Sequence, residues 1–153
     1  MNRYILTKAG IDVNEGIHRF NGNKELYEKF LTSFPEDIHY EQMLEAIEQK
    51  DVDAAFQGAH ALKGITGTVS LAKLHSLLIP LVEELRAGSM EKVPELLPPV
   101  KKAYDEVVLV LDKNNEVPLT TLYYLGLLPS KDYKDILKQI NKGEEVNPET
   151  SKI

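Results

Sequence analysis

The chain has 153 residues, of which 42% are hydrophobic and 27% charged, and its formal net charge is −6. These values are ordinary for a soluble globular domain, and the scattered Lys and Arg residues in an acidic chain argue against nucleic acid as the main partner. The chain has no cysteine, which excludes disulfides and thiolate metal sites and agrees with a cytoplasmic location.

Motifs exclude several further classes of protein. The N-terminal residues carry no apolar core of a secretory signal, and no run approaches the roughly 20 apolar residues that span a bilayer. Gly-rich nucleotide-binding loops and the zinc-protease and serine-hydrolase motifs are missing, so we expect no enzyme with a self-contained active site. His18, His39 and His75 are dispersed along the chain without metal-ligand spacing, so we expect no metal site.

The first predicted element is a short helix. Asp12 is a suitable N-cap with Glu15 three residues later, and the turn signal Asn21-Gly22-Asn23 ends the helix. A second helix is predicted to start near Lys24 and to be interrupted by Pro35.

A capping-box pattern, Ser33 followed by Glu36, predicts that a helix restarts or bends at Pro35 and runs to about Lys50. The sequence leaves open whether this region forms two helices or one kinked helix. The residues expected to be buried by its last part are Ile38, Met43, Leu44 and Ile47.

The next two helices are the best marked. Asp51 is predicted to cap a helix that runs towards Val69, and a turn near Ser70 leads to the following helix. Pro80 is expected to kink that helix, and Gly88 to end it.

The C-terminal part is predicted in five pieces. Residues 94–99 contain three prolines and predict a connector, and residues 100–115 predict the last long helix. The apolar residues 118–128 are expected to cover the bundle rather than to bind a ligand. A short helix after Ser130 and a polar tail at residues 143–153 complete the chain.

These elements predict an all-α fold, because amphipathic helices joined by short links pack as an antiparallel bundle. We expect a four-helix bundle with a short N-terminal helix and an additional C-terminal helical segment. The bundle is assigned to residues 9–113 and the extension to residues 114–153.

The helix after Asp51 carries the functional signal. On a helical wheel its apolar stripe lies opposite His60, so His60 should face solvent. The stripe consists of Ala55, Gly58, Leu62, Ile65 and Val69. The residues within about 60° of His60 are Asp53, Phe56, Gln57, Lys63, Gly64 and Gly67.

This neighbourhood suits phosphoryl transfer. Glycine costs about 1 kcal/mol relative to alanine in a helix interior, yet Gly64 and Gly67 lie on the same face as His60 and lower the surface for an approaching protein. An exposed neutral imidazole is a nucleophile near physiological pH. Lys63 can neutralise the charge of a transferring phosphoryl group, and Gln57 can donate a hydrogen bond to it.

Simpler interpretations stay open for single residues on this face. A lone helical histidine is often an ordinary surface residue. Spacing alone does not distinguish this role of His60 from that of a phosphoryl acceptor. Phe56 is either an exposed docking residue or a side chain tucked against the neighbouring helix.

The segment Ala59-His60-Ala61-Leu62-Lys63-Gly64, followed by Gly67 and Leu74, resembles the signature of histidine phosphotransfer (HPt) domains. Residues 10–16, followed by Phe20 and Leu26-Tyr27, resemble the N-terminal portion of the same family. The resemblance covers roughly residues 9–113. The chain departs from the family pattern at Ser70, where members often have a glycine, at Pro80, and beyond about residue 115.

The resemblance implies that His60 accepts a phosphoryl group from the aspartate of a response-regulator receiver domain or a hybrid histidine kinase and passes it on. Lys63 and Gln57 would assist this transfer, and the partner would bind over Asp53, Phe56, Gly64 and Gly67. The chain would be a monomeric carrier without a kinase or ATP site and without a cofactor of its own, because the receiver supplies Mg²⁺.

Two other functions fit the same residues. In the first, the bundle binds or scaffolds receiver domains without transferring phosphate. In the second, the chain is the phosphotransfer part of a larger kinase whose ATP-binding site lies in another chain.

Overall fold

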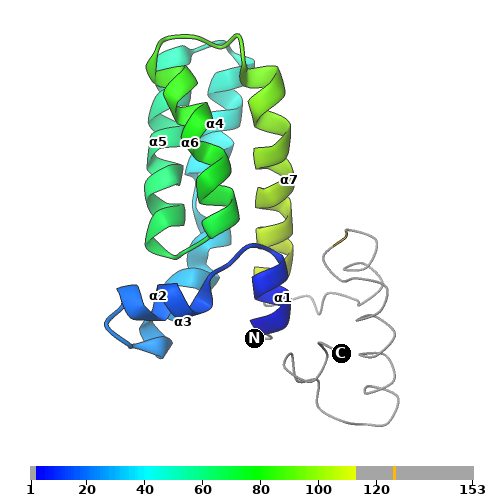
Figure 1. The fold of residues 1–153 in the computed structure, drawn as a ribbon. Helices are drawn as coiled ribbons and strands as arrows, with labels where there is room; N and C mark the ends of the chain where they lie inside the picture. The colour runs from blue at the N-terminus through cyan, green and yellow to red at the C-terminus, as the bar shows by residue number, and fades with distance from the viewer. Residues whose placement is uncertain (1–2, 113–125, 127–153) are drawn as a thin grey trace.

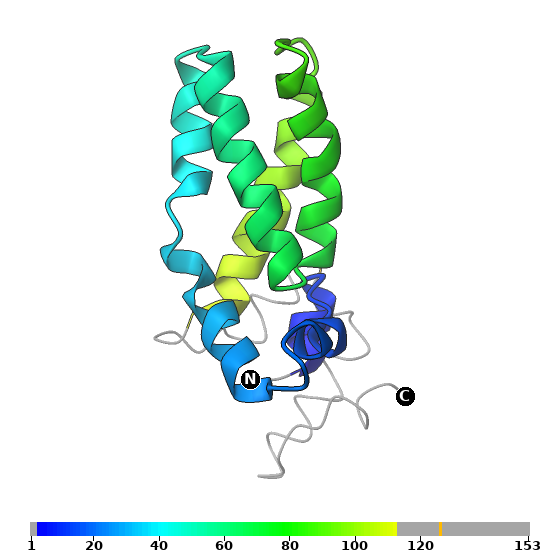
Figure 2. The same cartoon turned by 90° about the vertical axis from the view of Figure 1, so that its left-hand side faces the viewer.

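The computed structural model describes residues 3–112 and Gly126, and within this part every regular element is a helix. Four helices form an antiparallel bundle, which confirms the predicted all-α fold (Figures 1 and 2). They are α4 (His39–Glu48), α5 (Val52–Thr68), α6 (Ala72–Arg86) and α7 (Val93–Leu111). No helix in residues 3–112 is long and apolar enough to cross a membrane.

The remaining helices gather at the end of the bundle where α5 turns into α6 (Figure 1). They are α1 (Arg3–Lys8), α2 (Val13–Arg19), α3 (Lys24–Ser33) and the 3₁₀ turn η1 (Phe34–Glu36). The sequence did not predict α1, which is too short to show helical periodicity. It nevertheless buries Tyr4 and Leu6. The predicted extension, residues 114–153 with the helix after Ser130, lies outside the described residues apart from Gly126.

Side-chain caps determine where three of these helices begin. The Asp12 carboxylate accepts a hydrogen bond from the Glu15 amide at 3.1 Å, and Asp51 accepts one from Ala54 at 3.1 Å. Both predicted N-caps are therefore confirmed. Asn23, which ends the turn after α2, also caps α3 through the Leu26 amide at 3.0 Å.

The region around Pro35 forms two α-helices separated by η1 rather than one kinked helix. The predicted capping box is wrong, because the Ser33 hydroxyl donates to the Phe30 carbonyl at 2.8 Å. The predicted burial of Ile38 is also wrong: it is 57% exposed, because it lies at the N-cap of α4, ahead of the turn that faces the core. Met43 is buried as predicted.

The proline-rich segment is helical, so the predicted connector at residues 94–99 is wrong. Pro94 occupies the first turn of α7, where no backbone amide is needed as a donor. Pro98 and Pro99 are exposed, so the carbonyls that lose their helical partners can be hydrated. Burial of Val93 and Val100 holds this turn on the bundle.

Helix α6 continues through Pro80 as one element, with the proline on the exposed side. It ends at Arg86, and Gly88 follows in the left-handed region with φ +77°, as predicted for a C-terminal glycine. Because α5 and α6 are antiparallel, the end of α6 lies beside the first turns of α5 (Figure 1).

Candidate functional site

His60 lies on the exposed side of α5. The helix buries the opposite stripe, including Ala55, Gly58, Ala59 and Leu62, against α4 and α6. No hydrogen bond within the described residues engages either ring nitrogen of His60, so both are available. The predicted outward orientation of the imidazole is confirmed, and it follows from the helical period of the buried side chains.

The strip around His60 is open and polar. Gln57 is exposed, Lys63 is partly exposed, and Gly64 is exposed one turn after His60. A Cβ atom built at Gly64 meets no atom within 4 Å. Gly64 therefore leaves free space beside the imidazole, with the Lys63 ammonium within side-chain reach of a group bound to His60.

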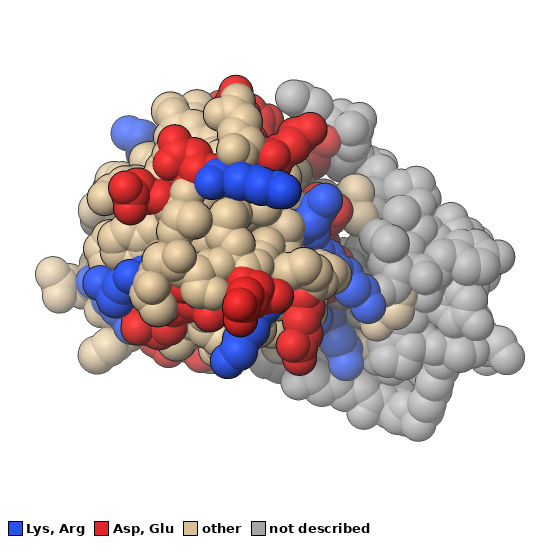
Figure 3. Space-filling view, turned by 90° about the horizontal axis from the view of Figure 1, so that it is seen from above, with Lys and Arg blue, Asp and Glu red and all other residues tan. Residues whose placement is uncertain are grey.

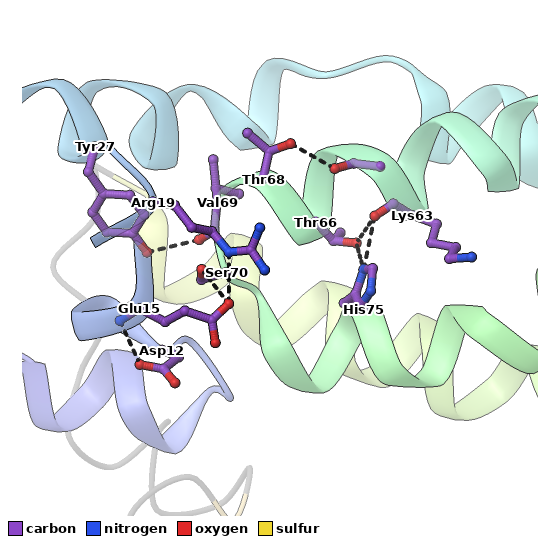
Figure 4. A network of polar contacts seen from close by, with 11 residues as sticks. Asp12, Glu15, Arg19, Tyr27, Lys63, Thr66, Thr68, Val69, Ser70 and His75 are labelled. Carbon is purple, nitrogen blue, oxygen red and sulfur yellow. Dashed lines mark hydrogen bonds and ion pairs between the residues drawn. The ribbon is translucent and has the colours of Figure 1, made fainter. Parts of the chain in front are cut away.

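Gly67 has a different environment from Gly64. A Cβ at this position lies 3.1 Å from Cε1 of His75, so the missing side chain makes room for a histidine of α6. His75 Nδ1 lies 3.0 Å from the Lys63 carbonyl and 3.3 Å from the Thr66 hydroxyl (Figure 4). Because the Thr66 hydroxyl itself donates to the Lys63 carbonyl at 2.9 Å, we assign the proton to Nδ1 of His75. This contact links α6 to α5 beside the exposed strip around His60.

Phe56 lies between His60 and the neighbouring helix. Its ring stacks on His60 with centroids 5.5 Å apart and planes at 27°. The Arg86 guanidinium of α6 lies over the same ring, 4.9 Å from its centroid. The sequence pattern places Phe56 on this face but does not indicate Arg86, because no local pattern connects the end of α6 with the first turns of α5.

The site and the bundle agree with a family whose model matches the sequence. The Hpt domain model matches residues 25–109. The chain belongs to the Hpt domain family. No curated protein and no solved structure matches it. Within this Hpt domain, His60 lies on the exposed side of α5 and inside the matched residues.

A groove borders the His60 strip of the Hpt domain on the side of α3. It is lined by Phe30, Phe34, Ala61, Gly64 and Ile65, among other residues. Phe30 is 49% exposed. No local sequence pattern predicts this groove, because it is formed where α3 and η1 meet α5 in space.

The turn between α5 and α6 is fastened to the N-terminal helices of the Hpt domain (Figure 4). The Tyr27 hydroxyl donates to the Val69 carbonyl at 2.9 Å, and the Asp12 amide donates to the Ser70 carbonyl at 2.9 Å. Ser70 adopts φ +56°, a left-handed conformation that favours glycine. Its hydroxyl donates to Glu15 at 3.3 Å, so serine adds a contact that glycine would lack.

Two ionisable groups of this junction have shifted pKa values. Burial raises the pKa of Tyr27 to about 12, which keeps the phenol protonated and able to donate to Val69. The hydrogen bond from Arg19 lowers the pKa of Glu15, an exposed carboxyl. Tyr27 thus holds the α5–α6 turn as a buried neutral donor, and Glu15 accepts from Ser70 while it is paired with Arg19 within α2.

Charge is mixed on the end of the bundle at which α4 leads into α5 and α6 into α7. On this face acidic and basic side chains are interspersed with uncharged ones (Figure 3). In residues 3–112, His, Asp and Glu form no group of three that could hold a metal ion. Because charges of both signs are mixed on this face, a partner that approaches from this end meets individual charged side chains rather than an electrostatic potential of one sign.

Proposed function

We propose that this Hpt domain carries a phosphoryl group on His60, which it accepts from the aspartyl phosphate of a receiver domain and returns to another. The observation that carries the proposal is the outward imidazole with unengaged nitrogens beside the open space at Gly64. An acceptor must be reached in line by a group held in another protein. A histidine sealed in the core could not be reached in this way.

The transfer is written as a displacement at phosphorus. A neutral ring nitrogen of His60 forms the N–P bond while the P–O bond to the receiver aspartate breaks, and the carboxylate leaves with the electron pair of that bond. The imidazole then carries a positive charge, which it loses by releasing the proton of its other nitrogen to solvent. Transfer to a second receiver reverses these steps.

Each residue around His60 has a part in this proposal. Lys63 offsets charge on the phosphoryl oxygens, and Gln57 donates a hydrogen bond to them. Gly64 allows the two protein backbones to come close. The receiver domain supplies the Mg²⁺ that its aspartyl phosphate requires, so the Hpt domain needs no cofactor of its own.

The test uses receiver domains phosphorylated with radiolabelled acetyl phosphate. Wild type should take up an acid-labile label, and His60→Gln should take up none. His18→Gln is the matched control, because it removes another exposed histidine, on α2. If His60→Gln accepts as much label as wild type, the proposal is wrong. If receivers bind both proteins equally but no label moves, the domain is a scaffold.

A further inference from the structure

Three side chains from two helices form a layered stack at the candidate acceptor. His60 and Phe56 are four residues apart on α5, so their side chains lie on the same face. Their rings stack at 5.5 Å and 27°. Arg86, the last residue of α6, covers the Phe56 ring at 4.9 Å from its centroid.

Arg86, the outer layer of the stack, forms an ion pair on its own helix. Arg86 Nε lies 3.3 Å from the Glu83 carboxylate, one turn earlier on α6. Phe56 is partly buried and packs against the core. The Phe56 ring is therefore confined by the core and by a guanidinium plane, and His60 is the exposed member that rests on it.

A ring that rests on a confined ring has fewer orientations available. An exposed imidazole on a helix otherwise samples several side-chain rotamers, and a reaction in line needs one of them. Aromatic stacking contacts have a preferred geometry and a measurable strength, and a cation over an aromatic face adds to it. The stack can therefore select the orientation from which a ring nitrogen attacks.

We propose that Phe56, held in place by Arg86, is a positioning residue that orients the His60 imidazole for phosphoryl transfer. The inference rests on the proposed function of His60 and adds the mechanism by which its ring is aimed. Arg86 acts through Phe56, and the bonds formed and broken are those of the displacement described above.

The first measurement does not depend on phosphoryl transfer. The NMR signals of the His60 ring protons should be shielded by the Phe56 ring, and they should move downfield in Phe56→Leu but little in Phe56→Tyr. Phe30→Leu is the matched control, because Phe30 is an exposed aromatic residue whose ring is tilted by 44° against the ring of Phe20. Unchanged His60 signals in Phe56→Leu would overturn the proposal.

The second measurement separates orientation from docking. In single-turnover transfer from a phosphorylated receiver, Phe56→Leu should lower the maximal rate by about two- to tenfold, the equivalent of one aromatic contact. The receiver concentration at half-maximal rate should not change, and Phe56→Tyr should restore most of the rate. A changed half-maximal concentration with an unchanged maximal rate would make Phe56 a docking residue and refute the proposal.

A double-mutant cycle tests the part of Arg86. Arg86→Gln should slow the transfer in the wild-type background and have little further effect in Phe56→Leu, because Arg86 acts through the ring. Equal slowing in both backgrounds would show that Arg86 acts on the phosphoryl group or the receiver directly. Should His60→Gln still accept label while the ring signals move as expected, the proposed function fails and the stack itself stands.

Discussion

Replacing Gly64 by alanine should make the bundle more stable and phosphoryl transfer slower. The new Cβ meets no atom within 4 Å, so nothing in the fold opposes it. Alanine is favoured over glycine in a helix interior by about 1 kcal/mol, which corresponds to a rise in the melting temperature of about 3–5 °C. The same methyl group projects from the open strip beside His60, where a receiver domain must come close.

A graded series separates the two effects. Gly64→Gln should keep most of the gain in stability but slow the transfer by about tenfold or more, since its longer side chain holds the partner away by several ångströms. Thermal unfolding and transfer from a labelled receiver measure the two quantities on the same samples. Ala54→Gln is the control, because it enlarges an exposed residue on another face of α5. Wild-type transfer by a folded Gly64→Gln protein would refute this reasoning.

Three further predictions concern packing and pH. Gly67→Ala places a Cβ 3.1 Å from His75. In urea unfolding, the free energy of unfolding should therefore rise by less than the helix propensity of about 1 kcal/mol, and by the full amount in a His75→Ala background. Equal gains in both backgrounds would speak against this contact. Gly16→Ala drives a Cβ into the Tyr27 ring and should lower the free energy of unfolding by about 1–3 kcal/mol, and a neutral substitution would contradict it. Burial raises the pKa of Tyr27 and Tyr40 to about 12, so the unfolded chain loses these protons first as the pH rises. Stability should hold below about pH 10 and fall by up to about 2.7 kcal/mol per tyrosine as the pH approaches 12; urea unfolding at about pH 8 and pH 11 measures the loss, and equal stability at both would contradict the burial argument.

Local patterns were sufficient to predict the helix that carries His60. An Asp at the N-cap and a helical stripe of small and apolar residues specify where α5 begins and which side it buries. The outward direction of His60 follows from these two facts alone. The predictions at Asp12 and Asp51 succeeded for the same reason, since a cap and its partner are three residues apart.

Predictions failed where packing overrides local preference. Three prolines suggested a connector, but burial of Val93 and Val100 makes a helix of that segment. Ile38 suggested a buried position from its type, but it precedes the turn of α4 that faces the core. The contact of Arg86 with Phe56 joins two helices whose register is set by the whole interface, and no spacing along the chain encodes it.

The hydrogen bonds at the α5–α6 turn also bear on how the domain should be excised. The family match starts at residue 25, yet Leu6, Ala9 and Ile11 belong to the same core, and the Gly10 carbonyl accepts from the Lys73 amide at 3.1 Å. A fragment that begins at residue 25 would lack these core residues and the hydrogen bond to Lys73. It would also expose to water the apolar side chains that they cover. The cooperative folding unit therefore begins some twenty residues upstream of the boundary that sequence similarity suggests.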